Sequence, residues 1–468
     1  MGKNKKSAVA KKSGPPIHSK FGTPSVRVGL VGLGYVGLPL ALLFASKGLR
    51  TTGFDIDAEK IKKLERGETY IRHIPAAEIK AQVEAKRFRA SADFRGLRGM
   101  DVIIICVPTP LDQHREPDLS FIRNTAESIR EHLRRGQLVV LESTTYPGTT
   151  QELVLPILER SGLHCPVEAY SAANNVVEVN DGSEGEFLLA FSPEREDPGN
   201  KSFKTHQIPK VVGGVNAASA WAARALYGQV FDRTLVVSSS RAAEMAKLLE
   251  NIYRCVNIAL VNELKQVCMR MGIDIWEVIE AAKTKPFGFT PFYPGPGLGG
   301  HCIPIDPFYL TWKAREYEVP TRFIELAGEV NSAMPEFIIE SLVEALNRQK
   351  KCLQDARVLV LGVAYKKDID DLRESPSLRI MKLLQGRGAR VDYNDPYFPT
   401  LHKMRHYNFK LASVALTPAN LAEYDAVIIS TDHSSYYYDE IVRCSRLVVD
   451  TRNATRQVRG GDEKIVRC

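Results

Sequence analysis

A glycine-rich turn near the N-terminus constrains this chain more than any other feature. Residues 26–57 read VRVGLVGLGYVGLPLALLFASKGLRTTGFDID, so that a β-branched run leads into Gly32, Gly34 and Gly37 and an apolar helical stretch follows them. A second short strand pattern then ends at Asp55. Strand, tight turn, helix and strand together make one βαβ unit, which predicts a parallel sheet.

The three glycines point to a dinucleotide site. Gly32 permits the tight turn, Gly34 lets a pyrophosphate approach the backbone, and Gly37 lets the helix pack closely on the strand. A carboxylate at Asp55, 18 residues after Gly37, would hydrogen-bond ribose hydroxyls and repel a 2′-phosphate. The pattern therefore predicts NAD rather than NADP, with a purely structural glycine turn as the alternative.

The alternation of strands and helices continues along the chain. Two further strand patterns lie at 101–110 and 137–144, with helical spacing over 119–133 between them. Weaker echoes of the same alternation follow at 356–368, 389–396, 424–433 and 446–453. Such alternation places helices on both faces of a parallel sheet. We expect an α/β protein with two doubly wound, Rossmann-like domains joined by a long central helix or helical domain.

The segment between the two predicted sheets is an uninterrupted helical pattern. Residues 241–272 contain no proline and no internal glycine, and a helix of that length would be roughly 45 Å long. We expect it to bridge the domains and to form a dimer interface, with a core helix as the alternative. The expected boundaries are a disordered tail at 1–22, a first sheet domain at 23–235, a helical dimerisation domain at 236–350 and a second sheet domain at 351–468.

Charge and cysteine content exclude several classes of protein. The formal charge of the 468 residues is +8, but residues 1–20 hold six lysines and no acid, which leaves 57 basic against 55 acidic residues elsewhere. Nucleic-acid binding is therefore not expected, and no apolar stretch approaches the roughly 20 residues of a membrane span. The eight cysteines show neither CxxC pairs nor zinc spacing, which is typical of a reduced, cytoplasmic protein without a structural metal.

A second glycine-rich segment, GPGLGGHCIPID at 295–306, carries the strongest candidate nucleophile. Flexible glycines precede Cys302, and Pro304 suits the first turn of a helix, so we expect Cys302 at a helix N-terminus that stabilises its thiolate. Asp306, four residues on, would lie on the same face, within reach of a water or the sulfur. A buried structural cysteine is the alternative.

Other candidates lie on the long helix and at strand ends. Lys247 and Asn251 share a helix face at i and i+4, where an ammonium and an amide could stabilise an oxyanion; a solvated lysine is the alternative. The carboxyl ends of parallel strands are where open α/β sheets bind ligands. Three segments are expected there, with ordinary loop residues as the alternative: Val107–Pro110, Glu142–Thr144 and Ser192–Glu194.

Taken in chain order, these motifs resemble those of the UDP-glucose/UDP-mannosaminuronate dehydrogenase family of nucleotide-sugar 6-dehydrogenases. The resemblance covers about residues 25–455, and its spellings are most similar to the UDP-N-acetylglucosamine 6-dehydrogenase branch. The motifs that carry it are GLGYVG (32–37), VPTP (107–110), EST (142–144), SPE (192–194), EMAKLLEN (244–251), GLGGHCIPID (297–306), GVAYKKDIDDLRESPS (362–377) and DTRN (450–453).

The resemblance implies an NAD domain, a central dimer-forming domain and a C-terminal domain that binds UDP. A sugar C6 hydroxyl would be oxidised twice, with two NAD+, through a thiohemiacetal and a thioester on Cys302. Asp306 and Thr144 would position or activate the hydrolytic water, Lys247 and Asn251 would stabilise the oxyanion, and Glu194 would act in the same acid/base network.

The resemblance also implies which residues bind the two ligands. The expected NAD contacts are Gly32, Gly34, Tyr35, Val36, Gly37, Asp55, Lys60, Thr109 and Thr144. The expected UDP-sugar contacts are Glu194, Lys247, Asn251, Gly299, Gly300, Tyr365, Lys366 and Arg452. Lys60 stands where the family often has an arginine. Pro198 stands where the UDP-glucose branch has a glutamate, and this difference weakens the interpretation that UDP-glucose is the substrate. The polar insert 166–186 has no counterpart in the family pattern.

Several alternatives remain open at this point. The sugar could be UDP-glucose, UDP-N-acetylgalactosamine or UDP-N-acetylmannosamine, because stereochemistry depends on the shape of the pocket. A non-catalytic nucleotide-binding protein is a second class, although the cysteine, lysine and aspartate of the motif are all present. A two-electron hydroxyacid dehydrogenase shares the βαβ start but assigns no role to Cys302.

Overall fold

The structure is a computed structural model that describes residues 17–71, 74–112, 116–167, 186–195, 203–300, 303–401, 403–404 and 407–468. Contacts divide the chain into two compact units. The first unit contains nearly all residues up to Lys247. The second unit contains Leu248–Cys468, and the short segment Leu111–Pro117 is also assigned to it. Residues 168–185 of the polar insert 166–186 lie outside the described residues, and so does Pro198.

The first unit is built on an eight-stranded sheet with the order β3-β2-β1-β4-β5-β6-β7-β8. Every neighbouring pair is parallel except β6 and β7, which are antiparallel. The strands are β1 (Arg27–Val31), β2 (Arg50–Phe54), β3 (Phe88–Ser91), β4 (Val102–Ile105), β5 (Leu138–Leu141), β6 (Leu188–Phe191), β7 (Lys210–Gly214) and β8 (Thr234–Val236).

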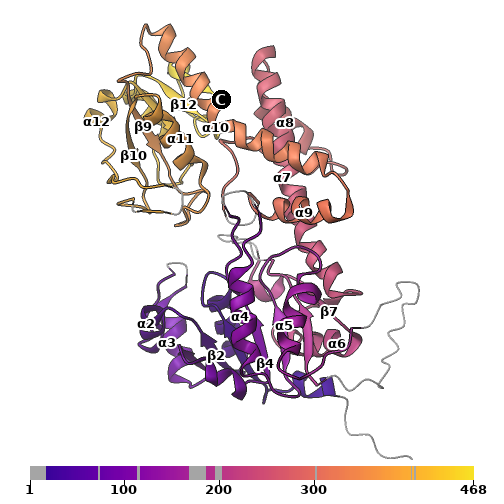
Figure 1. Ribbon diagram of the computed structural model, residues 1–468. Coiled ribbons are helices and arrows are strands. Elements are labelled where there is room, and N and C mark those ends of the chain that lie inside the picture. The colour runs from indigo at the N-terminus through magenta and orange to yellow at the C-terminus, as the bar shows by residue number, and fades with distance from the viewer. Residues whose placement is uncertain are drawn as a thin grey trace, which may run out of the picture. The chain divides into compact units, whose positions relative to one another are not determined.

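Helices cover both faces of this sheet because its central strands are apolar on both sides (Figure 1). Along β4, Val102 and Ile104 belong to one apolar cluster, whereas Ile103 and Ile105 belong to the cluster on the opposite face. The first face packs α1 (Gly37–Ser46), α2 (Ala58–Glu65), α3 (Ala76–Glu84) and α6 (Ala217–Tyr227). The second face packs α4 (Ser120–Arg130) and α5 (Leu155–Glu159).

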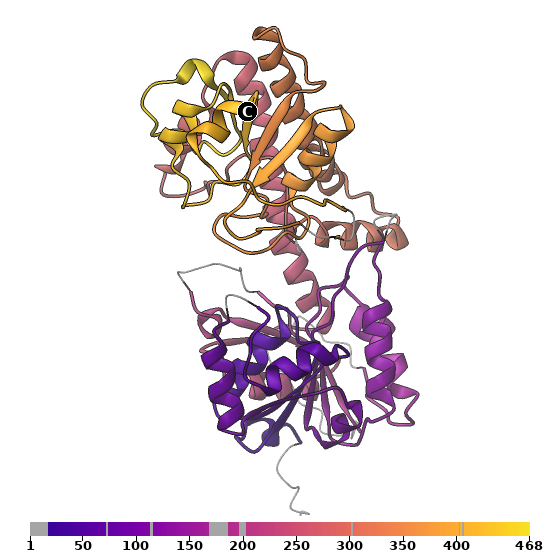
Figure 2. The ribbon, with the colours of Figure 1, turned by 90° about the vertical axis from the view of Figure 1, so that its left-hand side faces the viewer.

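The second unit contains a five-stranded, fully parallel sheet with the order β10-β9-β11-β12-β13 (Figure 2). Its strands are β9 (Arg357–Leu361), β10 (Arg390–Asn394), β11 (Ala426–Ile429), β12 (Val448–Asp450) and β13 (Ile465–Arg467). One face packs α10 (Arg322–Arg348) and α11 (Pro376–Gly386), and the other packs α12 (Pro418–Glu423) and α13 (Tyr438–Cys444). Helices α8 (Ile275–Lys283) and α9 (Asp306–Ala314) complete the unit.

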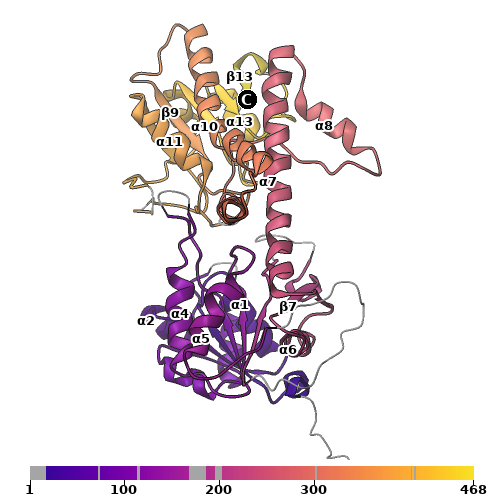
Figure 3. The same ribbon diagram turned by 45° about the vertical axis from the view of Figure 1, so that its right-hand side comes forward.

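The long helical pattern forms α7 (Ser240–Met271), a single helix of 32 residues that starts in the first unit and ends in the second (Figure 3). The predicted fold class, two doubly wound sheets and a long helix between them in the sequence, is therefore confirmed. None of the helices in the described ranges combines the length and apolar character of a membrane span.

The same hydrogen-bonding arrangement after the second strand occurs in both sheets. In the first unit a carboxylate oxygen of Asp55, just after β2, accepts a hydrogen bond from the Leu33 amide at 2.9 Å. In the second unit Asp395, just after β10, accepts one from the Val363 amide at 2.7 Å. In both units the aspartate after one strand (β2 or β10) holds the turn that follows the neighbouring strand (β1 or β9). This explains why the pattern at 26–57 is repeated more weakly at 356–396.

Candidate functional site

The glycine turn of the first unit has the space that a bound phosphate requires. Gly32 has a φ of +94°, and a Cβ atom there would lie 2.6 Å from the carbonyl oxygen of Cys106. A Cβ atom on Gly37 would lie 1.8 Å from the carbonyl oxygen of Gly32, so only glycine fits at the start of α1. A Cβ atom on Gly34 would meet nothing within 4 Å, which leaves its backbone open to a ligand.

Asp55 lies at the end of β2, beside this turn. Its side chain is buried, and besides the Leu33 amide it accepts a hydrogen bond from the Asp57 amide at 3.0 Å. Lys60 lies 3.4 Å from the same carboxylate. Tyr70 donates a hydrogen bond to the carbonyl oxygen of Leu33, and burial, with Asp55 adding to it, raises the pKa of its hydroxyl. A buried carboxylate beside open amides at a helix N-terminus fits the adenosine ribose and pyrophosphate of NAD.

The remaining expected NAD contacts are distributed around the same sheet edge. Thr109 is buried just beyond β4, and Thr144 is half-buried just beyond β5. Tyr35 is 38% exposed in the glycine turn, and Val36 is the half-buried residue before α1. All of these positions follow the carboxyl ends of parallel strands, as the sequence predicts.

A buried charge cluster that the sequence does not reveal lies at the same edge. The ammonium of Lys210 is 2.8 Å from a carboxylate oxygen of Glu142 and 3.7 Å from one of Glu194, and it donates to the carbonyl oxygen of Pro193 at 3.2 Å. Lys210 begins β7, and because β7 is antiparallel to β6 its first residue lies where the parallel strands end. Strand-end reasoning misses it for that reason; a lone lysine before the VVGG run is the only signal.

Lys247 and Asn251 are both buried, one turn apart on α7. Asn251 donates a hydrogen bond to the carboxylate of Asp306, and its own carbonyl accepts one from Arg254. Asp306 is buried as the first residue of α9. The structure therefore brings together two of the residues that the sequence assigns to catalysis.

Cys302 itself lies outside the described residues, as does His301. The helix that follows begins at Asp306, with Pro307 in its first turn, instead of including Pro304. The expectation that Pro304 starts the helix is therefore wrong, because residues 303–305 form a turn and the later proline occupies the helix start.

The glycine segment before Cys302 passes between two expected substrate residues. A Cβ atom on Gly299 would lie 2.5 Å from the Cβ of Tyr365, and one on Gly300 would lie 3.0 Å from the Tyr365 ring. A Cβ atom on Gly295 would lie 2.5 Å from the guanidinium of Arg452. Glycine is required at Gly299, where the backbone runs against the Cβ of Tyr365, and at Gly300, whose φ is +83°. At Gly295 the close atoms belong to the flexible end of Arg452. Lys366, next to Tyr365, is half-buried.

The segment is also held from α7. Asn262, whose side chain is buried, accepts a hydrogen bond from the Gly295 amide at 2.9 Å and donates one to the Asn331 side chain at 2.9 Å. The Gly300 amide donates to the carbonyl oxygen of Arg373 at 2.9 Å. The backbone of this segment is therefore fixed at both ends.

Arg452 presents an incompletely used guanidinium to the segment. Its Nε donates to the carbonyl oxygen of Ser430 at 3.0 Å, and within the described residues its terminal nitrogens have no hydrogen-bond partner. Burial lowers the pKa of Arg452, with Asp432 and Asp450 opposing that effect. A fixed arginine fork with unused donors is suited to phosphate.

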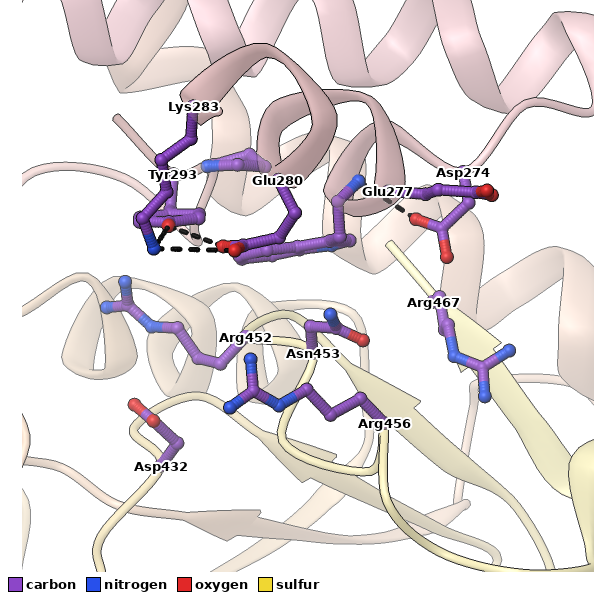
Figure 4. Close-up of a pocket in the computed structure, with 12 residues that line it drawn as sticks. Asp274, Glu277, Glu280, Lys283, Tyr293, Asp432, Arg452, Asn453, Arg456 and Arg467 are labelled. Carbon is purple, nitrogen blue, oxygen red and sulfur yellow. Dashed lines mark hydrogen bonds and ion pairs between the residues drawn. The ribbon is translucent and has the colours of Figure 1, made fainter. Parts of the chain in front are cut away.

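Arg452 lines a cavity of about 770 Å³ in the second unit. Figure 4 shows Glu280, Lys283 and Tyr293 on one wall and Arg452, Asn453 and Arg456 on the facing one. The rings of Trp276 and Tyr293 are stacked, with centroids 5.6 Å apart and planes 13° apart. The stacked rings and the cations suit a nucleotide. Sequence reasoning names only Arg452 here; the other residues come from separate segments that folding brings together.

No group of three or more histidine, cysteine, aspartate and glutamate side chains in the described part of the chain could hold a metal ion.

Comparison with known proteins agrees with this geometry. Three domains of the UDP-glucose/GDP-mannose dehydrogenase family match in order: the NAD binding domain at residues 26–231, the central domain at 241–333 and the UDP binding domain at 359–457. The chain belongs to this family. It is an NAD-dependent nucleotide-sugar dehydrogenase, an oxidoreductase that uses NAD as its cofactor.

Individual relatives differ in the sugar that their names specify. The chain is 37% identical to UDP-N-acetyl-D-glucosamine 6-dehydrogenase of Pseudomonas aeruginosa, over 88% of this chain and 91% of the relative. It is 33% identical to NDP-N-acetyl-D-galactosaminuronic acid dehydrogenase of Ralstonia solanacearum, over 91% and 95%. The solved structure of a UDP-D-ManNAc dehydrogenase from Pyrococcus horikoshii matches with a TM-score of 0.79 at 32% identity, over 92% of this chain and 96% of that one.

Proposed function

We propose that this dehydrogenase oxidises the C6 hydroxyl of a UDP-N-acetylhexosamine to the corresponding uronic acid, and that the sugar is N-acetylglucosamine. The relative at 37% identity, named for UDP-N-acetyl-D-glucosamine, supports this choice. A second relative with that name is 32% identical, and relatives named for N-acetyl-D-mannosamine or N-acetyl-D-galactosaminuronic acid are 33% identical. UDP-N-acetylmannosamine, UDP-N-acetylgalactosamine and UDP-glucose are the alternative substrates.

The observation that carries the proposal is the arrangement around the segment at 295–306. Asn251 and Asp306 are hydrogen-bonded and buried, and Asp306 is four residues after Cys302 in the chain. The same segment runs against Tyr365 and Arg452. A sugar diphosphate held by these two side chains would bring its sugar towards the cysteine, the amide and the carboxylate.

The proposed reaction removes four electrons from the sugar. NAD+ supplies the hydride acceptor, once for the alcohol and once for the aldehyde stage. The thiol of Cys302 adds to the C6 aldehyde to form a thiohemiacetal, and loss of a hydride and a proton from it leaves a thioester. Water then cleaves the C–S bond, which releases the carboxylate and returns the thiol.

The remaining residues support these steps. Lys247 and the amide of Asn251 stabilise negative charge on the C6 oxygen. Asp306 and Thr144 orient the water, and Glu194 accepts protons released during oxidation. Because the thiol has to remain reduced, the proposal includes a cytoplasmic location.

The proposal is tested with a panel of UDP-sugars, with NADH formation as the measured signal. We expect UDP-N-acetylglucosamine to give two NADH for each sugar consumed and no free aldehyde. One NADH for each sugar, with free aldehyde, would exclude the double oxidation. A preference for another sugar would reassign the substrate, and absence of NADH with every sugar would favour a non-catalytic nucleotide-binding protein.

We also propose that the enzyme acts as a homodimer or higher homo-oligomer. In the second unit, apolar side chains that are between 41% and 66% exposed recur along α7 in steps of three, four or seven residues: Leu249, Tyr253, Leu260, Leu264, Val267 and Met271. This stripe, which we call the α7 stripe, has the spacing of a helix face that packs on another helix. Because contiguous exposed apolar surface is uncommon on monomers, a second copy of the chain is the proposed occupant.

A further inference from the structure

The cluster around Lys210 is unusual because it buries three charged side chains at the edge of the first sheet. The side chains of Lys210 and Glu142 are 3% and 0% exposed, and that of Glu194 is 14% exposed. Tyr227 donates a hydrogen bond to the second carboxylate oxygen of Glu142. Among the described residues, the thiol of Cys106, directly after β4, also faces the cluster.

The ammonium of Lys210 donates hydrogen bonds to two different segments of the chain. One hydrogen bond goes to Glu142 after β5, and another goes to the carbonyl oxygen of Pro193, directly before Glu194. The ammonium is also 3.7 Å from the Glu194 carboxylate. Lys210 therefore contacts both the backbone and the charge of the SPE segment.

Electrostatics keep Lys210 charged. Burial by itself would lower its pKa, but Glu142 and then Glu194 outweigh burial, so the pKa of Lys210 is raised. Burial raises the pKa of Glu142, and Lys210 opposes this. The rings of Tyr227 and Phe231 lie 5.2 and 5.4 Å from the ammonium and add to its stabilisation.

Two buried carboxylates and one ammonium leave one negative charge in excess. Breaking a buried ion pair by removing one partner costs several kcal/mol because the remaining charge is uncompensated. Without Lys210, Glu142 would lose its buried counter-charge. The SPE segment would lose the hydrogen bond to Pro193 and the ammonium beside Glu194, whose carboxylate also accepts a hydrogen bond from the Arg195 amide at 2.6 Å.

We propose that Lys210 is a positioning residue that helps to hold the SPE segment and its Glu194 carboxylate in place, so that Glu194 can accept protons during sugar oxidation. This inference rests on the proposed function, which gives Glu194 its role in proton transfer. The competing explanation is structural: Lys210 would serve only to neutralise Glu142.

The two explanations are separated by removing both members of the Lys210–Glu142 pair. The variants are Lys210→Met, Lys210→Arg, Glu142→Gln and the double variant Lys210→Met/Glu142→Gln, in the full chain. Lys204→Met is the control, because Lys204 is an exposed lysine on the segment before β7. Thermal unfolding, NAD binding, kcat and the pH profile of kcat/KM are measured with the UDP-sugar that the wild type accepts.

We expect the double variant to fold and to bind NAD as the wild type does, because it removes both charges of the buried Lys210–Glu142 pair together. Its kcat should fall at least tenfold, and the acid limb of its kcat/KM profile should move to higher pH. Lys210→Arg should recover most of the activity, and Lys204→Met should match the wild type. Wild-type kcat and pH profile in the double variant would overturn the proposal, and so would a low kcat with an unmoved acid limb.

A further arm does not depend on activity. In the Glu142→Gln background, Glu194 is the remaining carboxylate beside Lys210 among the residues of this cluster. In the double variant Lys210→Met/Glu142→Gln, the folded protein should favour the protonated carboxyl of Glu194. The melting temperature of the double variant, relative to that of Glu142→Gln, should therefore fall as the pH rises from 5 to 8. A constant difference would overturn the proposal even if no UDP-sugar is oxidised, whereas the absence of oxidation alone rejects only the proposed function.

Discussion

Arg452 illustrates how a single residue can be prepared for a ligand. Its Nε is fixed on Ser430, and the described residues leave its terminal nitrogens without a partner. Replacement by methionine should raise the KM for the UDP-sugar roughly 10- to 100-fold, because a hydrogen bond to a charged group contributes about 1.5–3 kcal/mol. The KM for NAD should stay the same, since Arg452 belongs to the other unit.

Steady-state kinetics with each substrate varied in turn provide the check. Arg459→Met is the matched control, because Arg459 is an exposed arginine in the same unit and does not line this cavity. If Arg459→Met raises the KM for the UDP-sugar as much as Arg452→Met does, the rise reflects the net charge of the unit. The assignment of Arg452 to the diphosphate would then be wrong.

Cys302 is the residue on which the second oxidation depends. Cys302→Ser should keep the fold and NAD binding but lose turnover, because a hydroxyl is a far weaker nucleophile than a thiolate at neutral pH. Thermal unfolding, NAD titration and NADH formation measure the three properties. Cys352→Ser is the control, since Cys352 is exposed and distant in sequence from the motif. Near-normal activity in Cys302→Ser would remove it as the nucleophile.

The glycines of the candidate NAD site could be predicted because they belong to a motif that is local in sequence. Gly32 and Gly37 can be recognised from spacing, and the clash distances of their missing Cβ atoms explain why the spacing is required. Lys210 could not be predicted, because its place at the sheet edge follows from the antiparallel pairing of β6 and β7. Pairing between distant segments leaves no periodicity in the sequence.

At the level of elements, the start of α7 is attached to the segment after β5 by one buried carboxylate. Glu244 accepts hydrogen bonds from the Gly148 amide, from the Thr150 amide at 2.9 Å and from the Thr150 hydroxyl. Burial raises the pKa of Glu244 to about 7, although these hydrogen bonds oppose the shift. The segment it holds continues from Thr144, so the attachment fixes a strand end of the candidate NAD site.

This raised pKa predicts how stability depends on pH. Between the ordinary glutamate pKa of about 4.3 and a pKa of about 7, the folded protein binds a proton that the unfolded chain does not. Stability should therefore fall as pH rises through this window, by at most about 1.4 kcal/mol per pH unit from this group, and level off above it. Glu244→Gln, which cannot titrate, should lack that contribution.

Urea unfolding at several pH values between 5 and 8 measures the difference between wild type and variant. Glu78→Gln is the control, because Glu78 is an exposed glutamate in the first turn of α3, in the same unit. The expected result is a flatter pH dependence for Glu244→Gln alone. Equal pH slopes in wild type and Glu244→Gln would show that the carboxylate is ionised throughout.

Elements with buried, apolar strands were the most predictable part of the fold. The patterns at 101–110 and 137–144 correspond to β4 and β5, because burial on both faces selects continuous β-branched runs. The pattern at 241–272 corresponds to α7, because it contains neither proline nor an internal glycine. The cavity beside Arg452 was not predictable. Its walls come from α8, from the segment before Cys302 and from the ends of β12 and β13, and only tertiary packing assembles them.

For the whole molecule, the two units have separate parts of the proposed chemistry. The glycine turn and Asp55 belong to the first unit, whereas Asp306, Tyr365 and Arg452 belong to the second. Helix α7 contributes residues to both, with Lys247 ending the first unit and Asn251 in the second. One uninterrupted helix of 32 residues therefore contributes to both sets of residues.

The α7 stripe leads to a prediction about the assembled molecule. Burying a leucine side chain contributes roughly 1.5–3 kcal/mol, so a pair of symmetry-related stripes could hold two chains together. Leu260→Glu places a charge in the middle of the stripe and should convert the dimer to a monomer at micromolar concentration. The variant should fold normally, because Leu260 is 53% exposed within one chain.

Light scattering coupled to size-exclusion chromatography gives the mass of each variant. Phe323→Glu is the matched control, because Phe323 is 79% exposed on α10 and lies outside the stripe. The wild type and Phe323→Glu should have the mass of two chains or more, and Leu260→Glu the mass of one. A monomeric wild type, or equal dissociation of both variants, would contradict the assignment of the stripe to a second copy, because the loss would then not depend on where the charge is placed.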